Sequence, residues 1–456
     1  MTKKQIVILI LVALVFRIIY HQLVPFFDGS YNNGSDTGKY ILRAFAILDH
    51  GEMLLDFDGK MRIDLGRMPL YPYFLAAVFW LTGGENLSIV TAIQAVFSSL
   101  TVVAVGLIAG AFDRRWTVPA ALLACVWPAL IVYSAWVLTD SIFIDLFTWG
   151  ICACVWATKS GRPLPLLVVG GVAFGIAVLT RPILMFFPYL LVPLLAYLLF
   201  AGQGRRWRPT LAYALVPGII LLAFLGPRLL ATYNEYGAPV VTTQSGGQAL
   251  ELVYPCLRTD ANCDREAVNK RRFEMVSSAL QQLSEEDRDN PLIVDRIHRE
   301  VALELLRDVP PHIFVLAVVD SSARSILQTM LYEVGDQLNQ KPRYFSAVEG
   351  ETFRARLGDF LKEIFSSWFM AVWAVAQTAV LFALPIQVIG LVAGLRDPER
   401  RPTMVFLFFT AAYFLAVNLS FGNPKYGIPL NPVQIILLVA GCQVILDWWR
   451  RRLRTT

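Results

Sequence analysis

The stretch from Asp28 to Trp80 is a long polar interruption near the start of a chain that is otherwise mostly apolar. Within it, Asp36 follows a turn rich in Gly, Ser and Asn and precedes an amphipathic segment. An aspartate at such a place can cap a helix, or its carboxylate can take the proton of an incoming hydroxyl group. Long loops are costly to order, and functional residues concentrate in them. We therefore predict that Asp36 is the reactive group.

Asp140 carries the same two alternatives. It stands in the sequence LTDS, where one apolar segment ends and the next begins. Its carboxylate could cap the following helix or supply a second acidic group to the site. We keep both alternatives, and count Asp140 as a candidate catalytic residue beside Asp36.

The composition of the chain places both acids in a membrane protein. Of its 456 residues, 56% are hydrophobic and only 16% are charged, which is too apolar for a water-soluble protein of this size. Apolar windows of about 20 residues recur along the chain, and each is long enough to cross the hydrocarbon of a bilayer. Continuous apolarity indicates helices and not barrel strands. We predict an all-α polytopic membrane protein with about ten transmembrane helices.

The ten predicted spans fix the predicted topology. They are residues 5–24, 88–112, 117–137, 141–158, 163–180, 182–200, 209–230, 366–394, 402–420 and 428–448. The apolar stretches 69–82 and 312–331 are excluded: the first is too short, and the second contains Asp320 and Arg324, so both are expected to lie in the interface. Lys and Arg then gather at turns on one side, which the positive-inside rule makes cytoplasmic. The net charge of +5 therefore reflects the Lys and Arg residues at these turns, and we predict no nucleic-acid partner.

This topology divides the chain into three parts. Residues 1–230 form a transmembrane core with a first external loop at 25–87, residues 231–364 form a small, mainly helical external domain, and residues 365–456 form the last spans. An amphipathic helix in the external domain is expected to end before Pro310 and Pro311. Both termini are expected to be cytoplasmic, and Asp36 and Asp140 to share the external surface.

Positive charge is sparser at the predicted external membrane surface and is therefore informative there. Four basic residues at this surface run against the positive-inside rule: Arg67, Arg181, Arg228 and Lys425, the last of which is followed by Tyr426. Each can lie at the interface with its charge in water. Together on one face they also suit a phosphate group, because Arg offers forked donors and Lys a point charge.

The cysteines and the remaining motifs add little chemistry. Cys256 and Cys263 are close in sequence and lie in the predicted external domain, where the compartment is oxidising, so we predict a disulfide between them. No zinc motif, Walker loop or dinucleotide fingerprint is present in the sequence. The sequence DFDG at 56–59 matches the acidic motif of soluble sugar transferases, but it is also an ordinary turn.

Taken in order, these segments resemble the GT-C membrane glycosyltransferases, in particular bacterial relatives of protein mannosyltransferases and of the aminoarabinose transferase that acts on lipid A. The resemblance rests on Asp36 with Tyr40, GRMPLYPYFLA at 66–76, LTDS around Asp140, LTRP around Arg181 and the closing PKYGIPLNP. It covers nearly the whole chain, and its specific part is the order of these short motifs.

The resemblance implies roles for individual residues. Asp36 takes the position of the catalytic base and Asp140 the second acidic position. Arg67, Arg181, Lys425 and Tyr426 are implied to bind the donor phosphate, and Tyr40, Tyr71 and Arg228 to contact substrate. Relatives often carry an acidic cluster in the first loop, whereas here Asp36 is followed by Thr37, so we predict no metal and no other cofactor.

The predicted function is transfer of a sugar from a polyprenyl-phosphate carrier to an acceptor hydroxyl group at the external face of a bacterial inner membrane. The acceptor can be a glycan, a lipid or a protein, and membrane lipids are the remaining partners. The alternative is a polytopic transporter or a flippase for lipid-linked sugars. Against it, the charged residues gather in the external loops, whereas transport requires polar groups near the middle of the membrane.

Overall fold

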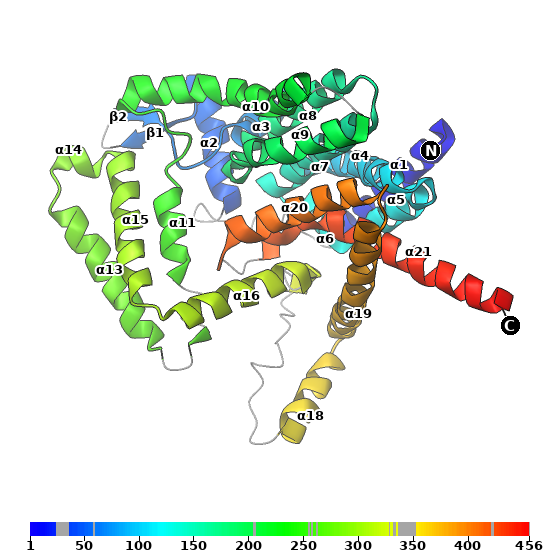
Figure 1. The fold of residues 1–456 in the computed structure, drawn as a ribbon. Coiled ribbons are helices and arrows are strands. Elements are labelled where there is room, and N and C mark those ends of the chain that lie inside the picture. Colours follow the sequence, from blue (N-terminus) through cyan, green and yellow to red (C-terminus); the bar gives the residue numbers. More distant parts are fainter. Residues whose placement is uncertain are drawn as a thin grey trace.

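A computed structural model of the chain shows a helical protein with one small β-hairpin (Figure 1). The structure describes residues 1–23, 36–57, 60–203, 207–253, 256, 259–260, 263–327, 329–331, 334–335, 353–420 and 424–455. The beginning of the predicted first external loop, residues 25–35, lies outside this part.

Eight helical segments of the described chain are long and apolar enough to cross a membrane. They contain the helices α1 (Lys3–Leu23), α4 (Leu87–Phe112), α7 (Thr139–Lys159), α9 (Phe187–Gln203), α10 (Trp207–Tyr236), α19 (Trp368–Arg396), α20 (Arg401–Asn418) and α21 (Asn431–Thr455). The protein is thus a multi-pass membrane protein, and the prediction of an all-α polytopic fold is confirmed.

The other two predicted spans are also helical, but one is bent and the other is short. Residues 117–137 contain α5 (Thr117–Cys125) and α6 (Pro128–Val132), flanked by the short helices η1 (Arg114–Trp116) and η2 (Tyr133–Ala135). The two halves of this segment are bent by 55°, because Pro128 holds Trp127 in an extended conformation with ψ 118°. The fifth predicted span is α8 (Pro163–Val178), whose 16 residues pack against α7 and α10.

The first loop forms a compact layer over these helices. It consists of α2 (Asp36–His50), the antiparallel strands β1 (Leu54–Phe57) and β2 (Lys60–Ile63), and α3 (Leu70–Thr82). Apolar residues of α2 face α3 at helical spacing, and Ile41 and Ile47 join Leu75 in a core shared by the two helices. With 13 residues, α3 is too short to cross a bilayer, as expected.

The external segment has a smaller core of its own. It contains α11 (Ser245–Glu251), α13 (Arg265–Gln281), α14 (Glu285–Arg288), α15 (Pro291–Arg307), α16 (Pro311–Leu327) and α18 (Phe353–Ile364). Val253, Ile297 and Leu305 pack between α11 and α15. Asn290 caps α15 and Pro291 starts it, and the helix ends at Arg307 before the prolines, as the sequence predicts.

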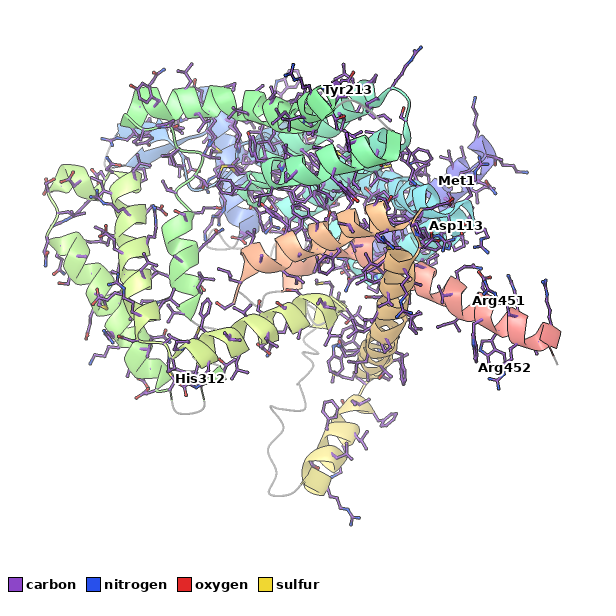
Figure 2. All side chains as sticks on the ribbon, viewed as in Figure 1. Met1, Asp113, Tyr213, His312, Arg451 and Arg452 are labelled. Carbon is purple, nitrogen blue, oxygen red and sulfur yellow. The ribbon has the colours of Figure 1, made fainter. Side chains whose placement is uncertain are left out.

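Both chain termini lie on the side of the molecule away from α13, α14 and α15 (Figure 1). Figure 2 places Met1, Arg451 and Arg452 at one end, and His312 of the external segment far from them. Aromatic rings of Phe147, Phe187 and Phe414 join α7, α9 and α20 in the core between these ends. This packing fixes the three helices relative to one another.

The predicted disulfide is absent from the structure, which has Cys256 and Cys263 as free thiols. The Cys256 thiol is buried and donates to the carbonyl of Leu252, one helical turn earlier. Cys263 lies at the entry to α13, where its amide donates to the Asp260 carbonyl. Proximity in sequence therefore did not bring the two sulfur atoms together.

Candidate active site

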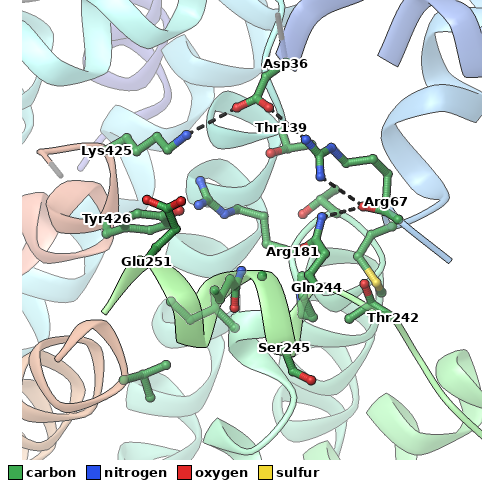
Figure 3. Close-up of a pocket in the computed structure, with 18 of the residues that line it drawn as sticks. Asp36, Arg67, Thr139, Arg181, Thr242, Gln244, Ser245, Glu251, Lys425 and Tyr426 are labelled. Atoms are coloured by element: carbon green, nitrogen blue, oxygen red, sulfur yellow. Dashed lines mark hydrogen bonds and ion pairs between the residues drawn. The ribbon is translucent and has the colours of Figure 1, made fainter. Parts of the chain in front are cut away.

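A cavity of about 1160 Å³ opens where the first loop, the ends of the membrane helices and the external segment meet. It brings together seven of the eleven predicted site residues. These are Asp36, Tyr40, Arg67, Asp140, Arg181, Lys425 and Tyr426. Residues from the two ends of the chain thus converge on one space (Figure 3).

Asp36 lies in the first turn of α2, between two cations. One carboxylate oxygen accepts a hydrogen bond from Arg67 Nη2 at 2.8 Å, and the other lies 3.3 Å from Lys425 Nζ. Partial burial raises the pKa of the Asp36 carboxyl, but the charges of Lys425 and Arg67 outweigh it, so the pKa is lowered overall. Asp36 is therefore ionised at neutral pH but is a weak base while it holds both cations.

Arg67 has a further donor that faces no partner. Its Nη1 donates to the Gly66 carbonyl and its Nη2 to Asp36, while its buried Nε has no hydrogen-bond partner within the described chain. A buried donor without a partner is costly in free energy. This guanidinium is therefore suited to an additional acceptor in the cavity.

Asp140 and Arg181 form a second, more deeply buried ion pair. Only 6% of the Asp140 side chain and 15% of the Arg181 side chain are exposed, and Arg181 Nη1 donates to the Asp140 carboxylate. The residue at the cap position of α7 is Leu138, and no side chain caps this helix. The capping alternative for Asp140 is thus wrong, and its carboxylate forms an ion pair with Arg181 instead.

Aromatic rings hold Arg181 and Lys425 in place. The Arg181 guanidinium lies 5.4 Å from the Tyr426 ring centre and 5.8 Å from that of Phe143. Lys425 Nζ is 5.5 Å from the Tyr426 ring. Both Lys425 and Tyr426 come from the short helix η5 (Pro424–Leu430), which precedes the last membrane helix. Tyr426 therefore acts on both cations at once.

Two predicted substrate contacts have other roles. Tyr71 is fully buried and its hydroxyl donates to the Gln94 side chain at 2.7 Å, so it faces the core and not the cavity. Arg228 donates to the carbonyls of Val241, Asp64 and Arg67, outside the cavity lining. The prediction that these two side chains contact substrate is therefore wrong, whereas Tyr40 does line the cavity, with its ring 5.8 Å from the Arg67 guanidinium.

The sequence did not indicate the residues that the external segment contributes. Gln244, Gln248 and Glu251 line the cavity from α11 and the turn before it, and Arg265 and Asn269 line it from α13. No motif marks these positions. The packing of α11 and α13 against α15, and the bond from Gln244 to the first loop, bring them to the cavity.

A second, apolar cavity of about 530 Å³ lies between α9 and α20. Phe186, Tyr413 and Val417 line both cavities, so the apolar space adjoins the polar one. Its remaining wall consists of Tyr189, Leu190, Phe409, Ala412 and Ala416. The site therefore offers charges at one end and an apolar groove at the other.

Comparison with protein families finds one match within the chain. The family described as dolichyl-phosphate-mannose-protein mannosyltransferase matches residues 67–229, which is about a third of the sequence. The matched segment contains Arg67, Asp140 and Arg181. A comparison with curated protein sequences found no match.

Solved structures share the fold at low sequence identity. The Archaeoglobus fulgidus oligosaccharyltransferase, in complex with Zn and sulfate, matches with a TM-score of 0.56 and 14% identity over 98% of this chain and 50% of its own. The same organism's AglB, in complex with an inhibitory peptide and a dolichol-phosphate, matches with a TM-score of 0.54 and 14% identity over 99% of this chain and 51% of its own. ArnT from Cupriavidus metallidurans, bound to undecaprenyl phosphate, matches with a TM-score of 0.35 and 14% identity over 94% of this chain and 78% of its own, which is too low to support a shared fold. The chain thus spans about half the length of the oligosaccharyltransferases whose fold it shares.

Proposed function

We propose that this chain, which has the fold of the GT-C membrane glycosyltransferases, transfers a sugar from a polyprenyl-phosphate carrier to an acceptor hydroxyl group. The observation that carries the proposal is that the two cavities adjoin and share Phe186, Tyr413 and Val417 as lining residues. A cluster of cations with a carboxylate adjoins an apolar groove between α9 and α20. A polyprenyl-phosphate sugar has the same two parts, an anionic head and a hydrocarbon tail.

The donor phosphate is assigned to Arg67, Arg181 and Lys425. Arg67 offers its unpaired Nε, and Arg181 is held at the cavity wall by Asp140 and by the Tyr426 ring. Fixed cations stabilise the charge that grows on the phosphate as it leaves. Asp140 is then a positioning residue, because its carboxylate acts through Arg181 and is itself buried.

Asp36 is assigned as the base. It takes the proton from the acceptor hydroxyl, whose oxygen attacks the anomeric carbon of the donor sugar. A new carbon–oxygen bond forms, the bond to the phosphate oxygen breaks, and polyprenyl phosphate leaves with the electron pair. Since the phosphate and Asp36 compete for Arg67 and Lys425, donor binding releases the carboxylate and strengthens it as a base.

The residues present do not fit a metal ion of the kind found in the archaeal structure. No group of three or more His, Cys, Asp or Glu side chains in the described ranges could hold one. Each oxygen of Asp36 faces a cation. We therefore derive no step through a metal.

The orientation follows from the positive-inside rule. We assign the end with Met1, Arg451 and Arg452 to the cytoplasm and the cavity to the external face of a bacterial inner membrane. The core then comprises residues 1–230 with 365–456, and the external domain residues 231–364.

Release of the lipid tests the proposal against a transporter. The purified chain in detergent is incubated with undecaprenyl-phosphate-linked sugars and a mixture of candidate acceptors, and undecaprenyl phosphate is quantified by mass spectrometry. We expect release in the absence of any membrane, because the reaction is chemical and needs no second compartment. Binding of the lipid-linked sugar without release, together with its movement across a vesicle membrane, would instead identify a flippase.

A further inference from the structure

One wall of the cavity is formed by the external segment and contains none of the residues assigned to the donor phosphate. This wall consists of the turn before α11, α11 itself and the first turns of α13. Figure 3 shows Gln244 and Ser245 across the cavity from Asp36, and Glu251 lines the same cavity. These side chains therefore line the same cavity as Asp36 from the external segment.

Asp295 of α15 holds this wall from behind. Its buried carboxylate accepts hydrogen bonds from Ser245 Oγ and from the Gly246 amide, each at 2.6 Å. Gly246 is required here, because a Cβ at this position would collide with the Asp295 carbonyl and would lie 2.8 Å from His298 Cβ. These contacts fix the first turn of α11 against α15.

The first loop holds the same wall from its other edge. Gln244 Nε2 donates to the Gly66 carbonyl at 2.6 Å, and the Thr243 amide and Thr242 hydroxyl both donate to the Leu65 carbonyl. These carbonyls directly precede Arg67. The wall is thus fixed relative to the donor cations before any acceptor binds, which lowers the entropic cost of binding.

Most of the side chains through which this wall lines the cavity are uncharged. Gln248 and Asn269 each offer an amide with two donors and an acceptor. The charged members of the wall, Glu251 and Arg265, have opposite signs, whereas the donor side of the cavity carries several cations. An anionic acceptor would therefore be drawn to the donor side and not to this wall.

The wall also lacks the features that bind peptides. None of its described cavity-lining residues is aromatic or aliphatic, so side chains of a peptide would find no apolar pockets. The β1–β2 hairpin lies in the first loop, so the wall offers no strand edge within the described chain either. Amides and a carboxylate instead match the hydroxyl groups of a sugar.

We propose that this wall, with Gln248, Glu251 and Asn269 as its recognition groups, binds an uncharged glycan as the acceptor. The proposal rests on the glycosyltransferase function proposed above and names its acceptor class. Asp295 is a positioning residue of this site, because its carboxylate acts through Ser245 and Gly246.

Binding by the full chain in lipid nanodiscs tests the proposal. The probes are a panel of neutral linear tetrasaccharides of hexoses and pentoses, the same compounds with a phosphate monoester, and a Ser/Thr-containing hexapeptide, each followed by saturation-transfer NMR. We expect neutral tetrasaccharides to bind. Gln248→Ala and Asn269→Ala should each weaken this binding about 2- to 10-fold, as for one lost neutral hydrogen bond. Gln281→Ala, an exposed site on the same domain, should leave it unchanged.

Asp295→Asn provides the positioning test. It should weaken saccharide binding as Gln248→Ala does, although Asp295 does not line the cavity, whereas Asp308→Asn at an exposed ion pair of the same domain should not. Thermal unfolding of each variant establishes that it is folded.

Two results would overturn the proposal: no neutral saccharide binds, or the peptide or the phosphorylated compounds bind and lose affinity with Gln248→Ala. Undecaprenyl phosphate binding in the same nanodiscs separates this failure from a failure of the proposed function. If the lipid binds and the saccharides do not, only the acceptor proposal is wrong. If the lipid does not bind, the donor assignment is wrong as well.

Discussion

Asp36→Asn separates the proposed role of this carboxylate as a base from its observed ion pairs with Arg67 and Lys425. The substitution keeps the size of the side chain and removes its charge. It therefore abolishes the proposed base, and it also removes the partner that holds Arg67 and Lys425 in the donor-free protein. Loss of the base lowers turnover, whereas loss of the ion pairs leaves Arg67 and Lys425 available and strengthens donor binding.

The expected magnitudes follow from these contacts. Loss of a general base lowers turnover by about 10²- to 10⁴-fold, or about 2.7–5.4 kcal/mol of activation free energy. Asp36 is 38% exposed, so each of its ion pairs falls in the range of about 0.2–1 kcal/mol. A donor phosphate no longer has to displace them, and we expect the donor to bind about 2- to 30-fold more tightly to the variant.

The assay measures both quantities on purified protein. Turnover is the release of undecaprenyl phosphate in the presence of acceptor, and donor affinity is the binding of undecaprenyl phosphate itself. Asp49→Asn, at an exposed acid on the same helix, is the control and should change neither. Turnover near that of the wild-type protein would refute the base assignment. Weaker lipid binding by Asp36→Asn would refute the competition between phosphate and carboxylate.

Three further predictions concern the same cluster. Arg181→Ala and Lys425→Ala should each lower donor affinity and turnover together, because a phosphate ligand acts in the ground state and on the leaving group; unchanged affinity in a lipid-binding assay would contradict this. Asp140→Asn should lower the free energy of unfolding by about 3 kcal/mol, because it leaves Arg181 buried without its partner, and Asp140→Glu should restore part of the loss in thermal unfolding and in turnover. The acid limb of kcat/KM should lie below the ordinary carboxyl pKa of 3.8, because the pKa of Asp36 is lowered in the free protein. The acid limb of kcat should lie at a higher pH, because the bound phosphate then pairs with Lys425 and Arg67 in place of Asp36. Acid limbs at the same pH would contradict this exchange of partners.

The membrane architecture could be predicted from the sequence because it depends on local composition. Whether a segment enters lipid as a helix depends on the apolarity of about 20 consecutive residues. All ten predicted spans are accordingly helical in the structure. The end of α15 at Arg307, before two prolines, is similarly local. Asp36 could be singled out for the same reason, since its surroundings are a polar loop in an apolar chain.

The partners of the charged residues could not be predicted in this way. Asp36 and Lys425 are 389 positions apart, and no local rule pairs them. Asp140 had the sequence of a helix cap, yet its carboxylate faces Arg181, and Arg228 had the sequence of an interfacial cation, yet it donates to three backbone carbonyls. The sequence by itself determined which segments enter the membrane and which loop carries the acid that we propose as the base. Only the tertiary structure decided which charges meet and which residues of the external segment face them, because these contacts depend on how distant helices pack and not on the free energy of any one segment.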